Sequence, residues 1–166
     1  MATALTEDLA LMLTRELDGV AREIEAFPDD ASIWRVGPGV TNAAGNLALH
    51  VAGNLQHFVG ALLGQTGYVR DREKEFAQRS GTRAEVIEEL LRARAVVVQV
   101  LPSLPAATLN STLAHDKLPT PVQAQRLLIH LAAHAGFHLG QIGYLRRMLT
   151  GENRSVGPLP VSLLVG

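Results

Sequence analysis

The apolar residues of this chain recur every three or four positions in four long segments, which predicts four amphipathic helices. The first helix is expected from Thr6 to Phe27 and the second from Asn42 to Leu63. The third begins at a capping box, Thr82-Arg-Ala-Glu85, and stops before Pro102. The fourth is expected from Pro121 to Met148. No segment has the alternation typical of a strand, so the pattern predicts an all-α four-helix bundle.

The segments that join the second helix to the third, and the third to the fourth, are each roughly 18 residues long, which leaves room for a crossover. Helices two and three can therefore run parallel. At 166 residues the chain is expected to be a single helical domain, 1–166.

The fourth helix has the clearest boundaries. Thr120 is a suitable N-cap, Pro121 occupies the first helical position, and Gln123 completes a capping box. Arg146 in the last turns is expected to complement the helix dipole, and Gly151 is expected to end the helix.

Two histidines lie inside the apolar stripe of this helix, one turn apart. At 100° per residue His134 and His138 face the same side as the leucines, with His130 and Gln141 at the edge of the stripe. Two imidazoles at i, i+4 can present nitrogens to one metal ion. Two hydrogen-bonded core histidines would give the same pattern, so the spacing alone leaves both interpretations open.

The second helix adds Asn46, His50 and His57 along one edge of its apolar stripe, with Asn54 nearer the centre of the stripe. His50 and His57 share a face but are two turns apart, about 10 Å, so they cannot both join the fourth-helix pair on one metal. The periodicity does not choose between them.

The polar segment 64–76 alternates positive and negative charges, which favours a solvated connection. The alternative is that Arg70 or Arg72 lines the mouth of a site. His115 lies in the irregular stretch 102–119, where a histidine is usually exposed.

Two apolar features outside the four helices are predicted to have packing roles. Trp34, the only tryptophan, is expected to plug one end of the bundle. The segment from Gly157 to Gly166 is apolar but contains two prolines, and is expected on the bundle surface or at a subunit interface.

The composition excludes several classes of function. A net charge of −1 gives no support for binding nucleic acid or an anionic membrane. The absence of cysteine excludes disulfides and thiolate ligands from this chain. No run is apolar enough to span a bilayer, and the acidic N-terminal region does not resemble a signal peptide, so a cytoplasmic location is expected.

Three segments in order resemble the DinB superfamily: His50–Phe58, Tyr68–Phe76 and His130–Ile142. The resemblance implies a four-helix bundle with up-down-down-up topology and a long crossover, often assembled as a homodimer. It also implies a metal held by one histidine of the second helix and two of the last. Carried onto this chain, these ligands are His50, His134 and His138, with His130 in a supporting or structural role and Gln141 as a partner of a ligand.

Three neutral imidazoles would leave a coordination position open, and zinc, nickel and iron all accept such ligands. Relatives in the superfamily use low-molecular-weight thiols such as bacillithiol or mycothiol. The leading hypothesis is therefore a thiol-dependent S-transferase acting on small electrophiles, with Arg70 and Arg72 contacting the thiol. The alternatives are a hydrolase that uses metal-bound hydroxide and a non-catalytic, stress-associated metal-binding bundle.

Overall fold

The computed structural model describes residues 4–116, 118–157 and 160–164. Four long helices dominate the described chain: α1 (Ala4–Glu25), α2 (Ala44–Leu55), α4 (Arg83–Val100) and α6 (Ala124–Thr150). The second long helix continues without a break as a π-helix, η2 (Gln56–Leu63). The shorter elements are η1 (Ser32–Trp34), α3 (Arg72–Ala77), η3 (Leu101–Ser103), α5 (Ala106–Asn110), β1 (Thr112–Leu113), β2 (Val122–Gln123) and η4 (Val161–Leu164).

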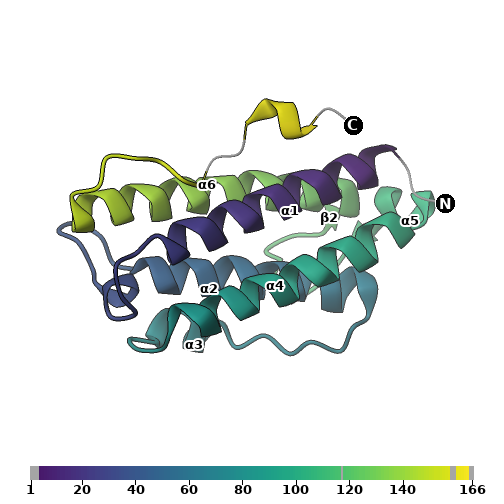
Figure 1. The fold of residues 1–166 in the computed structure, drawn as a ribbon. Helices are drawn as coiled ribbons and strands as arrows, with labels where there is room; N and C mark the ends of the chain where they lie inside the picture. The colour runs from purple at the N-terminus through teal and green to yellow at the C-terminus, as the bar shows by residue number, and fades with distance from the viewer. Residues whose placement is uncertain (1–3, 117, 158–159, 165–166) are drawn as a thin grey trace.

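The long helices lie side by side, and each packs against two others (Figure 1). Helix α1 contacts α4 and α6, and α2 contacts the same two helices from the other side. The apolar stripes meet in one continuous cluster of buried side chains, which explains why leucine and valine recur at helical spacing. Its fully buried members include Leu13, Leu17, Leu90, Leu128 and Ile142.

The chain between η2 and α4 runs back along the bundle and brings α3 beside the start of α2 (Figure 1). The sequence favoured a solvated connection here, and residues 71–74 are exposed, but Glu75 of α3 is buried. Asp71 caps this short helix by accepting a hydrogen bond from the Lys74 amide at 2.9 Å. The capping box predicted for the next helix is confirmed, because the Thr82 hydroxyl and the Glu85 carboxylate each accept the other residue's backbone N–H.

The predicted start of the last helix is wrong by three residues. Residues 122–123 pair antiparallel with residues 112–113, so this backbone is extended, and α6 begins at Ala124 without a side-chain cap. The Ala124 N–H donates to the Ser111 carbonyl instead. The helix ends as predicted at Gly151, whose φ of 76° suits glycine.

Trp34 closes one end of the bundle, as its isolation in the sequence suggested. Its side chain is buried, and its Nε1–H donates to the Gly81 carbonyl at 2.8 Å. A Cβ at Gly45 would lie 2.8 Å from the Trp34 ring, so this glycine allows the indole to approach α2.

Arg146, which the sequence places in the last turns of α6 with Arg147, is buried in an ion pair. Only 2% of it is exposed, and its Nε donates to Glu23 of α1 at 2.6 Å. The other oxygen of Glu23 accepts the backbone N–H groups of Val156 and Gly157 at 3.2 and 2.8 Å. This cluster, Glu23–Arg146, fixes residues 156–157 against α1 and α6. Part of the predicted apolar C-terminal segment, residues 158–159 and 165–166, lies outside the described residues.

Within the described residues, no helix combines the length and the apolar character that crossing a membrane requires.

Candidate metal centre

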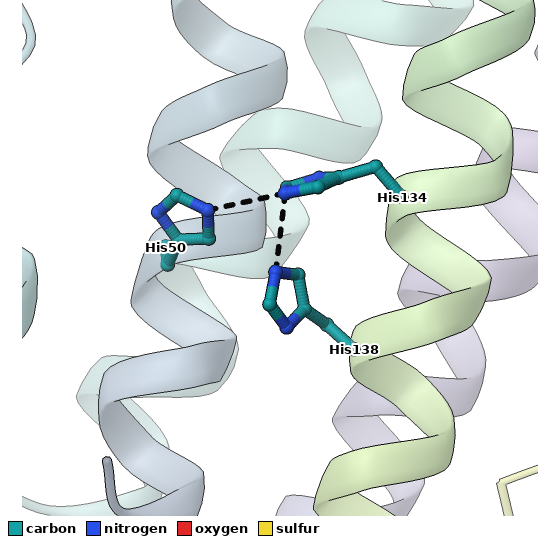
Figure 2. A group of neighbouring side chains, drawn as sticks. All are labelled: His50, His134 and His138. Atoms are coloured by element: carbon teal, nitrogen blue, oxygen red, sulfur yellow. Dashed lines mark hydrogen bonds between the residues drawn. The ribbon is translucent and has the colours of Figure 1, made fainter. Parts of the chain in front are cut away.

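Three imidazoles meet where α2 lies against α6 (Figure 2). His50 projects from α2, and His134 and His138 project from successive turns of α6. The Nε2 atom of His134 lies 3.3 Å from that of His50 and 3.1 Å from that of His138. Nitrogens around a tetrahedral zinc ion, each about 2.05 Å from the metal, are about 3.3 Å apart. The spacing of the three rings therefore suits one divalent ion.

His50 is oriented by a buried carboxylate. Its Nδ1 lies 3.1 Å from Glu75 Oε2, and Arg70 donates to both oxygens of Glu75 at 2.7 and 2.8 Å. Arg70 Nη2 is also 3.1 Å from Nδ1, but its shorter contact is to the carboxylate, so Glu75 is the partner that accepts the Nδ1 proton. In this tautomer Nε2 of His50 is unprotonated and carries a free lone pair, which is the state that a metal ligand needs.

His138 is oriented in the same way by its own helix. Its Nδ1 lies 2.7 Å from Oε1 of Gln141, three residues further along α6. An amide oxygen only accepts, so Nδ1 of His138 carries the proton and Nε2 is a lone pair.

Counting protons shows that the cluster cannot be satisfied by hydrogen bonds alone. The Nε2 atoms of His50 and His138 are both acceptors, and both lie close to Nε2 of His134. That atom carries at most one hydrogen, so at least one of the two contacts joins two lone pairs. A cation between the three nitrogens removes this conflict, and the residues present therefore fit a metal ion.

The electrostatics keep the ligands in the required charge state. Burial, together with the neighbouring imidazoles of His138 and His50, lowers the pKa of His134 from 6.5 to about 4. Burial also lowers the pKa of His138, against the opposing effect of the hydrogen bond that its Nδ1 donates to Gln141. Burial by itself would raise the pKa of Glu75, but the bonds from Arg70 and His50 hold it below its ordinary value. Near neutral pH the site therefore combines neutral rings at His134 and His138 with an ionised supporting carboxylate.

The three histidines differ in how deeply they are buried. His50 is buried, with its ring 4.8 Å from that of Phe76, whereas His134 and His138 are half-buried. Phe137 is 62% exposed and its ring lies 5.3 Å from that of His138. The solvent-exposed part of the cluster therefore lies on the α6 side, beside Phe137.

Several predicted residues lie apart from the three nitrogens. The ring of His57 is buried against Phe58 and His115, and His115 is half-buried rather than exposed as expected. His130 is exposed, with its ring 5.9 Å from that of His134. Arg72 is also exposed and lies over the Phe76 ring. Arg70 belongs to the site, but it holds Glu75 rather than facing a ligand.

The sequence reasoning missed Glu75. It lies in a segment of alternating charges, where nothing in the spacing distinguishes one buried acid from its exposed neighbours. Two features of α2 place it: Asn46 donates to the Glu75 and Gln78 carbonyls at 2.9 Å, and Gly53 leaves room for the carboxylate. Glu75 falls within the segment Tyr68–Phe76 that carried the family resemblance, and that was the available signal.

The comparisons with known proteins bear on the family and the fold. The model of the DinB superfamily matches residues 12–142. Among solved structures, the chain is similar to the "conserved protein of locus from Enterococcus faecalis", with a TM-score of 0.73 and 19% sequence identity. That match covers 91% of this chain and 100% of the other, and at this identity it shows the fold alone. No curated protein is significantly similar to the chain.

Proposed function

The chain belongs to the DinB superfamily, and from this premise we propose that it is a metal-dependent enzyme whose ion is held by His50, His134 and His138. The observation that carries the proposal is the convergence of three Nε2 atoms, two of which carry lone pairs that the third cannot both satisfy without a cation. Zinc, nickel and iron suit such ligands equally. Three neutral ligands leave room for a further ligand, which is the pattern of catalytic sites.

The reaction that we propose is transfer of a low-molecular-weight thiol of the bacillithiol or mycothiol type to a small electrophile. The thiol must come from outside, because the chain has no cysteine. The metal, when bound, would supply acidity, lowering the pKa of a coordinated thiol. The sulfur forms a bond to carbon, the leaving group departs with the bonding electrons, and the thiol proton passes to solvent.

The groups around the histidines favour a thiol nucleophile over water, because the nearby carboxylate is not free to act as a general base. A hydrolase that activates water profits from a free general base near the metal. Among the described residues the carboxylate that contacts the cluster is Glu75, and both of its oxygens accept from Arg70. Its role in this proposal is to orient His50, while Gln141 orients His138.

We also propose the up-down-down-up topology and long crossover of the family for this bundle. The opposite directions of α2 and α6 in Figure 1, and the return of the chain from η2 to α3, support it. A single domain, a homodimeric assembly and a cytoplasmic location complete the proposal.

The first experiment is metal analysis of protein purified without a histidine tag. About one zinc, nickel or iron ion per chain is expected, and substoichiometric metal after reconstitution would favour the non-catalytic alternative. The loaded protein is then incubated with bacillithiol, mycothiol or N-acetylcysteine and 1-chloro-2,4-dinitrobenzene. Thioether formation that depends on metal supports the transferase. Hydrolysis of 4-nitrophenyl acetate without a thiol, and no thioether, would replace it with the hydrolase.

A further inference from the structure

A cavity of about 760 Å³ lies between α2, α4 and the segment 68–81. None of the three histidines of the metal centre lines it, and neither does Asn54, which is buried in α2. Pockets that bind small molecules have volumes of about 300–1,000 Å³. The cavity is therefore large enough for a small molecule, and the groups on its walls indicate which kind.

Two oxygen atoms meet above Gly53 on the wall of this cavity. A Cβ at Gly53 would lie 2.1 Å from Oε1 of Glu75 and 3.5 Å from the hydroxyl oxygen of Tyr68, and all three residues line the cavity. Because glycine has no side chain, both oxygens approach α2 at the same point. One ammonium group can therefore contact both, at the distance of about 2.7–2.9 Å that is usual for a charged hydrogen bond.

Both oxygens have room for a further hydrogen bond. An ionised carboxylate offers about four acceptor sites. Arg70 occupies one on each oxygen of Glu75, and His50 occupies the second on Oε2, so one site on Oε1 is left. No described residue forms a hydrogen bond with the Tyr68 hydroxyl, whose oxygen is an acceptor. The ligand that suits this pair is a donor.

The charges around the cavity favour a cation. The acids that line it are Asp71, Glu75, Glu85, Glu88 and Glu89, and the bases are Lys74 and Arg92. Burial and the negative charges of Glu75 and Glu89 raise the pKa of Tyr68, against the opposing effect of Arg70. A cleft lined mainly by one sign of charge attracts ligands of the opposite sign.

We propose that this cavity binds a small organic amine, whose ammonium group donates to Oε1 of Glu75 and to the hydroxyl of Tyr68. Aliphatic amines and diamines form the class of ligand. The inference goes beyond the proposed function and does not rest on it, because neither a metal nor a thiol takes part. Glu75 is shared between the two sites, since its other oxygen lies against His50.

The experiment compares three four-carbon probes by calorimetry on the full chain, at about 0.15 M salt to screen non-specific attraction. Putrescine ends in ammonium groups, 1,4-butanediol in hydroxyls and succinate in carboxylates. Putrescine should bind at one site at least about 10-fold more tightly than either of the others, the equivalent of one charged hydrogen bond. Equal affinities for putrescine and the diol would overturn the inference.

Two variants locate the bound ammonium. Tyr68→Phe removes only the hydroxyl, and putrescine should bind about 10-fold more weakly. Glu89→Gln removes a charge from the wall and should weaken putrescine about 5-fold. Glu73→Gln is the matched control, because this acid of α3 does not line the cavity, and its effect should stay within about 2-fold. Equal effects of the three variants would mean attraction to the surface charge as a whole and would overturn the site.

Thermal unfolding separates ligand binding from a structural role of the hydroxyl. Because the hydroxyl has no partner in the described chain, Tyr68→Phe should keep the Tm within about 3 °C of the wild type. A larger fall would show that the hydroxyl serves the fold, against its assignment to the ligand. A wild-type chain that binds putrescine but no zinc would remove the proposed function and leave this inference standing.

Discussion

The bundle contains two polar clusters that are each built on a buried carboxylate accepting from an arginine, but they differ in whether every polar group finds a hydrogen-bond partner. In the Glu23–Arg146 cluster one carboxylate oxygen accepts from the guanidinium and the other from two backbone N–H groups. Each group there finds a partner of the opposite kind. In the metal centre the supporting contacts to Glu75 and Gln141 close in the same way, but the three Nε2 atoms face one another.

The difference shows which property identifies a functional site in this protein. A charged pair buried inside a bundle needs only to satisfy itself, and its energetic role is to avoid an unpaired charge. A site for a ligand keeps donors or acceptors whose partner is the ligand. Burial and charge alone would have ranked Glu23 and Arg146 above the histidines.

The largest expected effect comes from removing a ligand of the metal centre. His134→Ala should lower zinc affinity by more than about 100-fold, beyond the range for a residue that only supports a ligand. His130→Ala is the matched control, since this exposed histidine lies one turn earlier on the same helix. Competition with a chromophoric chelator measures both affinities. Equal losses in the two variants would contradict the assignment of His134.

Breaking the other cluster should cost stability and leave metal binding unchanged. Arg146→Met leaves the Glu23 carboxylate buried without its cation, and we expect the free energy of unfolding to fall by about 3–5 kcal/mol. Urea unfolding of the metal-free protein measures it. The double variant Glu23→Gln/Arg146→Met should recover part of the loss. A change in zinc affinity above about 2-fold would show that the two clusters are coupled and that the Glu23–Arg146 cluster does not serve stability alone.

The supporting carboxylate should matter less than a ligand but more than an ordinary surface acid. Glu75→Gln keeps the shape and removes the charge that fixes the tautomer of His50, so zinc affinity should fall about 10- to 100-fold. Glu73→Gln, an exposed acid two residues earlier, is the control and should bind zinc as the wild type does. An unchanged affinity in Glu75→Gln would mean that the tautomer of His50 is set by something else.

The periodicity of apolar residues predicted the long helices because each buries one stripe, and it placed His134 and His138 on the inward side for the same reason. It could not predict Glu75, Arg146 or the start of α6. Glu75 is buried by a segment that returns from the far end of the bundle, and Arg146 by a partner on α1. The pairing of residues 122–123 with 112–113 is likewise a contact between strands too short to have a pattern. The choice between His50 and His57 came from the family resemblance, and the geometry brings His50 to the cluster.

A smaller effect tests how Glu75 reaches His50. A Cβ at Gly53 would lie 2.1 Å from Glu75 Oε1, so Gly53→Ala must displace the carboxylate, and zinc affinity should fall by up to about 10-fold. At Gly140 of α6 a Cβ meets nothing within 4 Å, so Gly140→Ala should leave zinc affinity unchanged and stabilise the helix by about 0.5–1 kcal/mol. Identical zinc affinities in the two variants would contradict the conclusion that packing against Gly53 positions the Glu75 carboxylate.

The pH dependence of stability tests the burial of His134 without any metal. Because burial lowers the pKa of His134 from 6.5 to about 4, the unfolded chain binds a proton in this interval that the folded chain does not. The free energy of unfolding of the metal-free protein should therefore decrease as the pH falls from 6.5 toward 4. His134→Asn removes the titrating ring, and urea unfolding at pH 7.0, 5.5 and 4.5 should show a shallower decrease for this variant. Parallel decreases in the two proteins would mean that other groups cause the loss and that the ring of His134 protonates as readily in the bundle as in the unfolded chain.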